Sequence, residues 1–461
     1  MTKTFKSKYY LIVSLLLVFA ACGKNSDDPP PDDNGNDTTD ITDGCPELTR
    51  VIEDELPVDE LLDIVQSQTL KYFWDFAEPN SGMARERNTS GNLVTTGGTG
   101  FGIMAMIAGA ERGFIERDDV LERILKISNF LKDAERFHGA WSHWIDGTTG
   151  EALQFSQKDN GGDLVETAFL VQGLIAAREY FDGDTPLEES LRALVDTLWY
   201  GVDWQWYTQD QNVLYWHWSP DYDFEMNMQI RGWNEAMIIY VLAAASPTYP
   251  ISPAVYHQGW ARNGDMENGR YFYDIQLPLG PDFGGPLFFA HYSFLGLDPR
   301  GLNDQYASYW EQNRRHSIIN HKYAIANPKE FCHYSDSVWG LTASDDPIVG
   351  YQAHAPFDYY GKDNGTITPT AALSSMPYTP EESMKALRTF YYYLYDDLWG
   401  PYGFKDAFNF DENWFAGSYL AIDQGPIVVM IENHRSGLIW DVFMKNEDVL
   451  AGLDVLDLYY E

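Results

Sequence analysis

Residues 163–181 read DLVETAFLVQGLIAAREYF, and this stretch decides the fold class. Apolar and small residues from Leu164 to Ala177 fall on nearly every side of a helical wheel, which predicts a helix buried almost all round. A second helical pattern covers 186–202; it begins with Pro186 and two glutamates, and its charged residues lie on one face. A buried helix followed by an amphipathic one predicts an inner layer of helices covered by an outer layer.

The same alternation recurs along the chain. The patterns at 97–113 and 234–246 are of the buried type, and the pattern at 117–135 is amphipathic. Further helical patterns cover 57–77, 285–296, 303–325, 380–398 and 425–445, while the short alternating segments 139–145 and 213–218 predict hairpins on loops. We therefore predict an all-α fold, an α/α barrel in which outer helices wrap inner ones. A plain helical bundle or superhelix is the alternative.

Three regions of different composition divide the chain. Residues 1–22 carry three lysines before a short apolar run, which indicates a secretory signal peptide. Phe19-Ala20-Ala21-Cys22 resembles a bacterial lipobox, so we expect Cys22 to carry a lipid; an ordinary signal peptide is the alternative. Residues 23–46 contain seven Asp and one Lys without apolar periodicity, which predicts a flexible acidic tether. Residues 47–461 are expected to form one catalytic domain.

The charge and the aromatic content of that domain restrict its ligands. The net charge of the chain is −38; residues 1–22 carry +3 and the tether −6, which leaves −35 on residues 47–461. Such a field repels polyanions, so nucleic acid is excluded as a partner and acidic polysaccharides are disfavoured. The chain has 15 Trp and 30 Tyr, many of them in the long loops 136–162 and 203–233, where flat rings suit stacking on sugar faces. A large body that simply buries many rings is the alternative.

Clustered carboxylates are the strongest chemical indication. Asp159, Asp163 and Glu166 lie within eight residues at the start of one inner helix, while Glu235 and Asp423 lie at the starts of two others. Mutual repulsion raises the pKa of at least one carboxyl group, and a carboxylic acid that stays protonated near neutral pH is what glycoside cleavage requires. However, Asp163 and Glu166 have the form of a capping box, which needs no function.

Other chemistry has weaker support. The ten histidines are scattered without a metal-binding motif, and the sequence has no nucleophile elbow and no phosphate-binding loop, so we predict neither a metal nor a cofactor. Cys45 and Cys332 could pair in an oxidising compartment, but two cysteines do not make a disulfide framework. Tyr292, Tyr351 and His354 could serve a polysaccharide lyase, although contacts to sugar are the preferred interpretation.

Several motifs resemble a known family. The segments 96–102 (TGGTGFG), 158–166 (KDNGGDLVE), 232–235 (GWNE) and 422–426 (IDQGP) resemble the bacterial glucoamylase-like proteins, and more narrowly glycoside hydrolase family 144, the β-1,2-glucanases. Segments 368–372, 401–404 and 432–433 extend the resemblance over most of residues 60–450.

The resemblance implies a barrel of six α/α hairpins, (α/α)6, and inverting hydrolysis of β-1,2-glucan to sophorose or longer sophoro-oligosaccharides. It implies Glu235 as the general acid, Asp423 as the group that activates water, and Asp159, Asp163 and Glu166 as groups that bind sugar hydroxyls. We expect the substrate to be contacted also by Trp141, Trp144, Trp216, Trp218, Trp233, Arg87, Arg231 and Tyr402. An exo enzyme that releases sophorose is preferred slightly over an endo enzyme, because the loops 203–233 and 252–284 are long enough to block one end of a cleft.

Two other function classes remain open at this point. A polysaccharide lyase on a similar barrel would prefer uronates, which the charge of −35 disfavours. A non-catalytic glycan-binding lipoprotein would need aromatic and amide side chains rather than an acid and a base. The preferred hypothesis is a monomeric, exported lipoprotein of a Gram-negative bacterium, in the periplasm or at the outer membrane, that meets the membrane only through its lipid and acts on neutral β-glucan.

Overall fold

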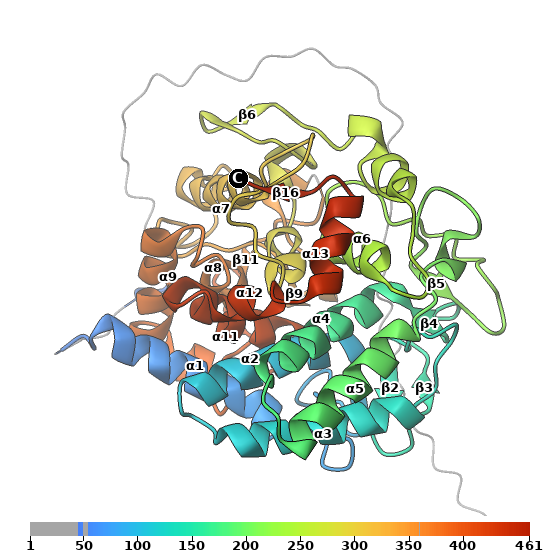
Figure 1. Cartoon of the computed structure of the whole chain (residues 1–461). Coiled ribbons are helices and arrows are strands. Elements are labelled where there is room, and N and C mark those ends of the chain that lie inside the picture. Colours follow the sequence, from blue (N-terminus) through green and yellow to red (C-terminus); the bar gives the residue numbers. More distant parts are fainter. Residues whose placement is uncertain (1–44, 49–53, 359) are drawn as a thin grey trace, which may run out of the picture.

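The computed structural model describes residues 45–48, 54–358 and 360–461, and these residues are predominantly helical (Figure 1). The helices are α1 (Val58–Trp74), α2 (Thr96–Glu111), α3 (Arg117–Asp133), α4 (Leu164–Tyr180), α5 (Pro186–Tyr200), α6 (Met237–Ala245), α7 (Tyr309–Ala326), α8 (Pro369–Leu373), α9 (Pro380–Tyr392), α10 (Tyr395–Leu398), α11 (Ala421–Arg435), α12 (Leu438–Phe443) and α13 (Glu447–Val455). The predicted signal peptide, Cys22 and most of the predicted tether lie outside the described residues.

Short strands and helical turns form the loops. The strands are β1 (Leu93–Thr95), β2 (Trp144–Asp146), β3 (Ala152–Leu153), β4 (Gly162–Asp163), β5 (His217–Trp218), β6 (Tyr271–Phe272), β7 (Ile275–Gln276), β8 (Leu302–Asn303), β9 (Ala343–Asp346), β10 (Gly350–Ala353), β11 (Thr366–Ile367), β12 (Trp399–Gly400), β13 (Gly403–Phe404), β14 (Phe408–Asn409), β15 (Trp414–Phe415) and β16 (Tyr459–Tyr460). They pair into small antiparallel sheets of two or three strands, such as β1-β2-β3 and β11-β14-β15.

The helices form the predicted inner and outer layers. The residues of α2, α4 and α6 are buried on all sides for most of their length, whereas α3, α5 and α9 bury one face and expose charged residues on the other. Figure 1 shows α3 and α5 side by side on the outside of α2 and α4, and α13 against α6. The predicted alternation of buried and amphipathic helices is thus confirmed for the first five helices after α1.

Glycines allow the inner helices to approach one another closely. A Cβ on Gly100 of α2 would lie 2.1 Å from the carbonyl oxygen of Phe169 in α4, and a Cβ on Gly173 would lie 2.2 Å from the carbonyl oxygen of Gly100. No side chain fits at such distances, so the backbones of α2 and α4 touch only because both positions are glycine. A Cβ on Gly425 of α11 would likewise lie 2.5 Å from Phe101 in α2.

The inner segments follow one another in space. Helix α4 contacts both α2 and α6, and α11 contacts both α2 and α8. Between α6 and α8 lie two 3₁₀ turns, η5 (Leu287–Ala290) and η6 (Tyr292–Phe294). The turn η6 contacts α6, and His291 Nε2 lies 3.0 Å from the Ser375 hydroxyl just after α8.

The structure differs from several predicted elements. The segment 285–296, predicted as one helix, is the pair η5 and η6. Gly285 at φ +80° and Pro286 delay the first turn to Leu287, and His291 at φ −109° separates it from the second. Helix α7 begins only at Tyr309 because the Asp304 side chain accepts the backbone N–H groups of Tyr306 and Ala307 and holds a turn before it.

The predicted hairpins and the C-terminal helices also need correction. The segment 139–145 does not fold back on itself; its end belongs to β2, which forms a local hairpin with β3 and also pairs with the distant β1. The segment 213–218 forms no hairpin of its own, because β5 pairs with the distant β4. The segment 425–445 is divided into α11 and α12 at Gly437, which has φ +75°. The pattern at 380–398 is divided into α9 and α10.

Two further findings concern the chain as a whole. Cys45 and Cys332 are joined by a disulfide, which fixes residue 45, inside the predicted tether, to the domain. The carbonyl oxygen of Pro46 also accepts a hydrogen bond from His333. Among the described helices, none combines the length and the apolar character needed to cross a membrane.

Candidate active site

The strand pair β4–β5 brings the two long aromatic loops together around Asp163. In its register Asp163 faces His217. Asp163 caps α4: its Oδ1 accepts the backbone N–H groups of Val165 and Glu166, both at 3.0 Å. Its Oδ2 accepts Nε1–H of Trp216 at 3.2 Å and lies 3.1 Å from Nδ1 of His143. The predicted capping role is confirmed, and the second oxygen holds two further groups.

Two histidines lie among the carboxylates. His217 Nε2 lies 3.1 Å from Asp159 Oδ2, and His143 Nε2 lies 4.0 Å from Glu166 Oε1. Although burial opposes it, the charge of Glu166 and the hydrogen bond to Asp163 raise the pKa of His143 to about 10, so this imidazole is a cation at neutral pH. Burial would raise the pKa of Asp163, but the hydrogen bond from His143 holds it below its usual value.

Glu166 lies at the other side of this cluster, held by the start of α2. Its Oε2 accepts the backbone N–H of Gly97 at 2.8 Å and the Thr95 hydroxyl at 3.4 Å. A Cβ on Gly97 would lie 2.6 Å from the same oxygen, so the contact requires glycine at position 97. Burial raises the pKa of Glu166, while the cationic His143 opposes that shift.

Glu235 lies in the turn that precedes α6. The Asn234 side chain caps this turn by accepting the backbone N–H of Ala236 at 2.9 Å. The backbone of Glu235 is fixed by Ser293 of η6, whose hydroxyl donates to the Glu235 carbonyl oxygen and accepts the Ile238 N–H at 3.0 Å. Glu235 is therefore held at both ends of the turn, and its side chain is half-buried at the wall of the site.

The environment of Glu235 favours its protonated form. Burial raises its pKa to about 7, against the effect of a backbone hydrogen bond, and the negative charges of Glu166 and Asp163 add to the increase. A carboxylic acid with this pKa is a proton donor at neutral pH.

Asp423 lies in the first turn of α11, rather than just before the helix, and makes contact with a second aspartate. Its side chain is 1% exposed and shares a hydrogen bond with the carboxyl group of Asp406, which precedes β14. The Asp406 carboxylate in turn accepts the backbone N–H of Asp345 at 2.6 Å. Burial and mutual repulsion raise the pKa of both carboxyl groups in the pair.

Tyr292 connects the two halves of the site. Its ring packs on Phe101 and Phe169, with ring centroids 5.1 and 5.7 Å away, at the junction of α2, α4 and η6. Burial raises the pKa of its hydroxyl well above 10, and the charges of Asp423 and Glu235 both add to the increase. The charges of Asp423 and Glu235 thus both act on the Tyr292 hydroxyl.

The aromatic residues expected to bind sugar divide into two groups. Trp144, Trp216 and Trp218 are partly exposed, which leaves part of each ring accessible. Trp141 and Trp233 are buried, with exposed fractions of 0% and 3%, and their role as sugar contacts stays a prediction. Trp141 donates its Nε1–H to the Leu131 carbonyl oxygen at 3.0 Å inside the core, and Trp233 stacks between Phe294 and Tyr309.

The remaining predicted contact residues lie in different settings. Arg87 forms ion pairs with Glu86 and Asp345, at 2.9 and 3.0 Å, and so belongs to the Asp406–Asp423 side of the site. Arg231 is exposed. Tyr402 is half-buried in a cluster of aromatic rings, where it packs on Tyr72, Phe76 and Tyr419.

His143, His217, Asp345 and Asp406 were not predicted as site residues from the sequence. His217 becomes part of the site through the β4–β5 pairing, and His143 lies just before β2, where its carbonyl oxygen accepts the Thr96 N–H at 3.1 Å; no local pattern shows either arrangement. Asp406 lies in a segment of short strands without helical periodicity. Only their position in aromatic-rich loops beside the carboxylate motifs could have drawn attention to them.

One group of side chains has the spacing of a metal site. Ligand atoms of His143, Asp159 and Asp163 lie within 4.8 Å of one another. A histidine binds a metal through a neutral imidazole nitrogen, however, and His143 with a pKa of about 10 is protonated. The imidazolium itself supplies the positive charge that balances these carboxylates.

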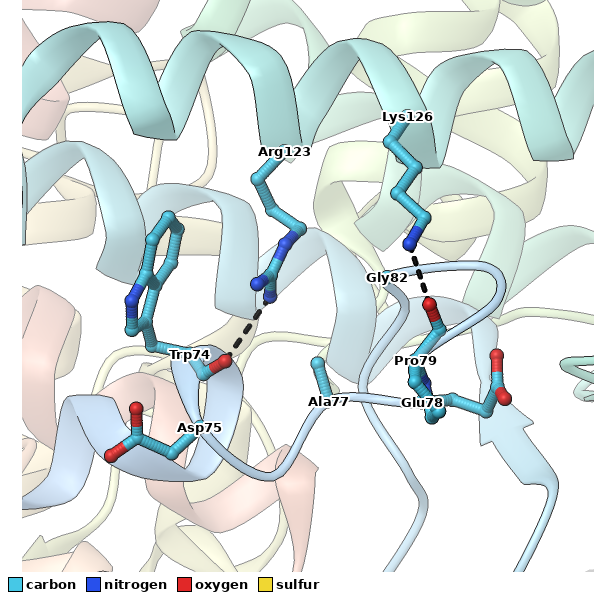
Figure 2. A pocket seen from close by; sticks show the side chains of 8 residues that line it. All are labelled: Trp74, Asp75, Ala77, Glu78, Pro79, Gly82, Arg123 and Lys126. Carbon is cyan, nitrogen blue, oxygen red and sulfur yellow. Dashed lines mark hydrogen bonds between the residues drawn. The ribbon is translucent and has the colours of Figure 1, made fainter.

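A cavity of about 210 Å³ lies elsewhere, between the end of α1 and the side of α3 (Figure 2). Its two cationic side chains are already bonded to the backbone: Arg123 donates to the Trp74 carbonyl oxygen at 3.2 Å, and Lys126 to that of Pro79 at 2.5 Å. None of the predicted site residues lines this cavity, so it is separate from the carboxylate site.

Comparisons with known proteins agree with this geometry. The family described as "Glycoamylase: Putative glucoamylase" matches residues 227–447. A curated protein of Parabacteroides distasonis, "Exo beta-1,2-glucooligosaccharide sophorohydrolase (non-reducing end)", is 48% identical over 416 residues; the match covers 86% of this chain and 57% of that protein, so the chain spans little more than half of its relative's length.

Two solved structures are similar over nearly their whole length. A Bacteroides uniformis protein described as a "putative glucoamylase" is 55% identical, and an endo-β-1,2-glucanase of Chitinophaga pinensis, solved with sophorotriose and glucose, is 52% identical. Each comparison has a TM-score of 0.86 and covers 88% of this chain and 99% of the other.

Proposed function

The chain belongs to the glucoamylase-like family, and on this premise we propose that it is a glycoside hydrolase that cleaves β-1,2-glucan and releases sophorose. One observation carries the proposal: burial and the charges of Glu166 and Asp163 raise the pKa of Glu235 to about 7, so this carboxyl group can donate a proton near neutral pH. The similarity to the Chitinophaga pinensis and Parabacteroides distasonis proteins supports this substrate. Within the family we assign the chain to glycoside hydrolase family 144.

The geometry suits hydrolysis by an acid and a base. Glu235 donates its proton to the glycosidic oxygen as the bond to the anomeric carbon breaks. On the Asp423 side, a water molecule gives up a proton and its oxygen bonds to the anomeric carbon from the opposite face, so the configuration inverts. Asp159, Asp163 and Glu166, balanced by His143, form a charged wall that accepts hydrogen bonds from sugar hydroxyls.

We propose release of sophorose from the chain end rather than cleavage in the middle of the chain. The loops 203–233 and 252–284 are long, and the relative with the curated name is an exo enzyme. The Chitinophaga pinensis protein is an endo enzyme at 52% identity, so the two modes of action occur on closely similar chains. The loops around the site, rather than the carboxyl groups, should therefore decide the mode.

None of Tyr292, Tyr351 and His354 is suited to act as the base of a lyase. Burial raises the pKa of both Tyr292 and Tyr351 well above 10, and nearby carboxylates add to the increase. His354 is fully buried, and its Nε2 lies 3.8 Å from Asp346 Oδ2. Burial lowers its pKa to about 4, which makes it a weak base.

We propose a closed barrel of six α/α hairpins as the scaffold of the site. The sequence of neighbouring inner segments α2, α4, α6, η5–η6, α8 and α11 supports this arrangement. The starts of α2, α4, α6 and α11 carry Gly97, Asp163, Glu235 and Asp423, as expected if one end of a barrel forms the active site.

We further propose that the mature protein is a monomer attached to a membrane by a lipid on Cys22, in the periplasm or at the outer membrane of a Gram-negative bacterium. The lipobox-like sequence before Cys22 and the acidic residues 23–46 support this proposal. Mass spectrometry of the N-terminal peptide from membranes should show a diacylglycerol-modified Cys22, and a Cys22→Ala variant should leave the membrane fraction.

The function is tested by incubation with linear β-1,2-glucan, with the products separated by chain length over time. Sophorose as the first and main product is the expected result. An early spread of chain lengths would replace exo by endo action. Unsaturated products that absorb ultraviolet light would indicate a lyase, and binding without products would indicate a glycan-binding protein.

A further inference from the structure

Asp406 is the strongest chemical group that the proposed mechanism leaves unused. It lies between β13 and β14 with an exposed fraction of 2%, and its backbone is fixed by a 3.0 Å hydrogen bond from its N–H to the Ser418 carbonyl oxygen. One carboxylate oxygen, Oδ2, accepts the Asp345 N–H at 2.6 Å. The other, Oδ1, receives no donor from any described residue.

The carboxyl group of Asp406 is in contact with that of Asp423. Neither oxygen of the Asp423 carboxyl group receives a donor from the described residues, yet the two carboxyl groups are in hydrogen-bonding contact. Two carboxylates have no hydrogen to place between them, so this contact requires one shared proton. Aspartic proteases use two carboxyl groups with one shared proton in the same way.

The charges around the pair favour retention of that proton. Asp345 adds a negative charge to the repulsion between Asp406 and Asp423. Arg87 opposes it, but its guanidinium group is already paired with Glu86 and Asp345. The other titratable groups that act on Asp423 are the hydroxyls of Tyr292 and Tyr351, both of which remain neutral.

We infer that Asp406 and Asp423 act as one base, a dyad that holds a single proton and a single negative charge between its two carboxyl groups. Asp423 is the member that meets the attacking water, and Asp406 is a positioning residue that orients Asp423 and sets its basicity. The inference rests on the proposed hydrolysis, because it identifies the base of that reaction.

The proton balance of the step is simple. The water oxygen forms a bond to the anomeric carbon while one of its protons moves to Asp423, so the dyad changes from one proton to two and becomes neutral. At the same time the bond from the anomeric carbon to the leaving oxygen breaks, and that oxygen takes the proton of Glu235. Solvent then takes one proton from the dyad and returns one to Glu235.

The pH dependence of kcat/KM on a sophoro-oligosaccharide tests the dyad. The acidic limb of this profile is the pH at which the dyad takes up a second proton and loses its negative charge. Above that limb the shared proton stabilises the charge, because the O–H of one carboxyl group is a strong donor to the other. In Asp406→Asn a weaker amide N–H takes the place of that O–H, so the acidic limb should move up by about half a pH unit or more, while KM stays within about twofold.

Two further variants show whether Asp406 acts by positioning Asp423 or only by supporting the fold. Asp423→Asn should lose about 10²–10⁴-fold in kcat, because the water-activating member is gone. Asp304→Asn changes a buried carboxylate in another network, where Asp304 accepts hydrogen bonds from Tyr256 and Tyr309, and should leave the acidic limb at its wild-type position. If Asp406→Asn does not fold, Asp406→Ser, whose hydroxyl is also a weaker donor than a carboxylic acid, takes its place in the same comparison.

Several results would overturn the inference. An acidic limb that moves down in Asp406→Asn would mean that Asp406 is an ionised carboxylate that repels Asp423, with no proton shared between them. An unchanged acidic limb in a folded Asp406→Asn would mean that Asp423 is the base without help from Asp406. A wild type that produces no sugar at any pH would overturn the proposed function and the inference together, whereas the first two results leave the proposed hydrolysis intact.

Discussion

Replacement of Glu235 by glutamine is the most direct test of the proposed acid. Glutamine has nearly the same shape but no acidic proton, so the variant cannot protonate the leaving oxygen at any pH. General acid catalysis contributes about 10²–10⁴-fold, and kcat/KM on β-1,2-glucan should fall by that factor.

The pH profile of the wild type gives a second, independent measure. Because burial raises the pKa of Glu235 to about 7, the protonated fraction is roughly nine tenths at pH 6 and roughly one tenth at pH 8. The alkaline limb of kcat/KM should therefore begin near pH 7, with about a tenfold loss for each pH unit above it. In Glu235→Gln, the small remaining activity should lack this limb. Wild-type turnover in the variant, or a wild-type alkaline limb above about pH 9, would refute the assignment.

Although Glu235→Gln should lower activity, it should raise the stability of the folded protein at neutral and alkaline pH. The pKa of Glu235 is raised from 4.5 to about 7 in the folded protein, so ionisation at high pH destabilises the fold; the penalty is absent below about 4.5 and complete above about 7. A shift of this size corresponds to at most about 3 kcal/mol, and the half-buried side chain reduces it to about 1–3 kcal/mol. Thermal melts should show little difference between the two proteins at pH 4, and a more stable variant at pH 8.

Three other predictions follow from single contacts. Gly97→Ala places a Cβ 2.6 Å from the Glu166 carboxylate and should lower kcat/KM on the glucan by about 10–100-fold. Ser293→Ala removes the hydroxyl that fixes the Glu235 turn, so thermal or urea unfolding should show a loss of about 1–3 kcal/mol and kinetics a lower kcat with an unchanged KM. Cys332→Ser opens a disulfide between residues 287 positions apart, and should lose about 2–5 kcal/mol in unfolding experiments under oxidising conditions.

Each of these predictions has a control that lacks the contact under test. Gly417→Ala adds a Cβ that meets nothing within 4 Å and should leave turnover unchanged. Ser128→Ala removes a buried hydroxyl that has no hydrogen-bond partner among the described residues, so it should cost less stability than Ser293→Ala. Equal effects within either pair would contradict the corresponding contact. For the disulfide, a wild-type melting temperature that dithiothreitol does not lower would contradict the predicted stabilisation.

The helical layers could be predicted because their information is local. Helix α3 was expected at 117–135 and occupies Arg117–Asp133, and α5 begins at Pro186 as predicted, with its cap at Thr185. Residue spacing alone distinguishes a helix buried all round from one with a charged face. The segments that failed, such as 285–296, depend on backbone geometry at glycine and proline more than on hydrophobic spacing.

The site could be predicted only where its residues also begin helices. Asp163 and Glu166 were found because a cap has a sequence pattern, and Glu235 because it adjoins the start of α6. Asp406 joins Asp423 where the segment after β13 meets the start of α11, at which Gln424 donates to the Phe404 carbonyl oxygen at 2.9 Å, and no pattern within the sequence indicates that contact. The buried Trp141 and Trp233 show the converse limit, since a ring in a long loop has the same sequence signature whether it faces the core or a ligand.

The arrangement of the charges explains how so many carboxyl groups can share one site. His143, with a pKa of about 10, lies against Asp163 and Glu166 and keeps Asp163 ionised. Glu235 receives no such cation: burial and the charges of the same two carboxylates raise its pKa to about 7. One histidine thus drives the pKa values of neighbouring carboxyl groups apart, which assigns ionised groups to sugar binding and the protonated one to acid catalysis. The wall formed by Asp159, Asp163 and Glu166 therefore contributes to catalysis through the field it imposes on Glu235, without itself transferring a proton.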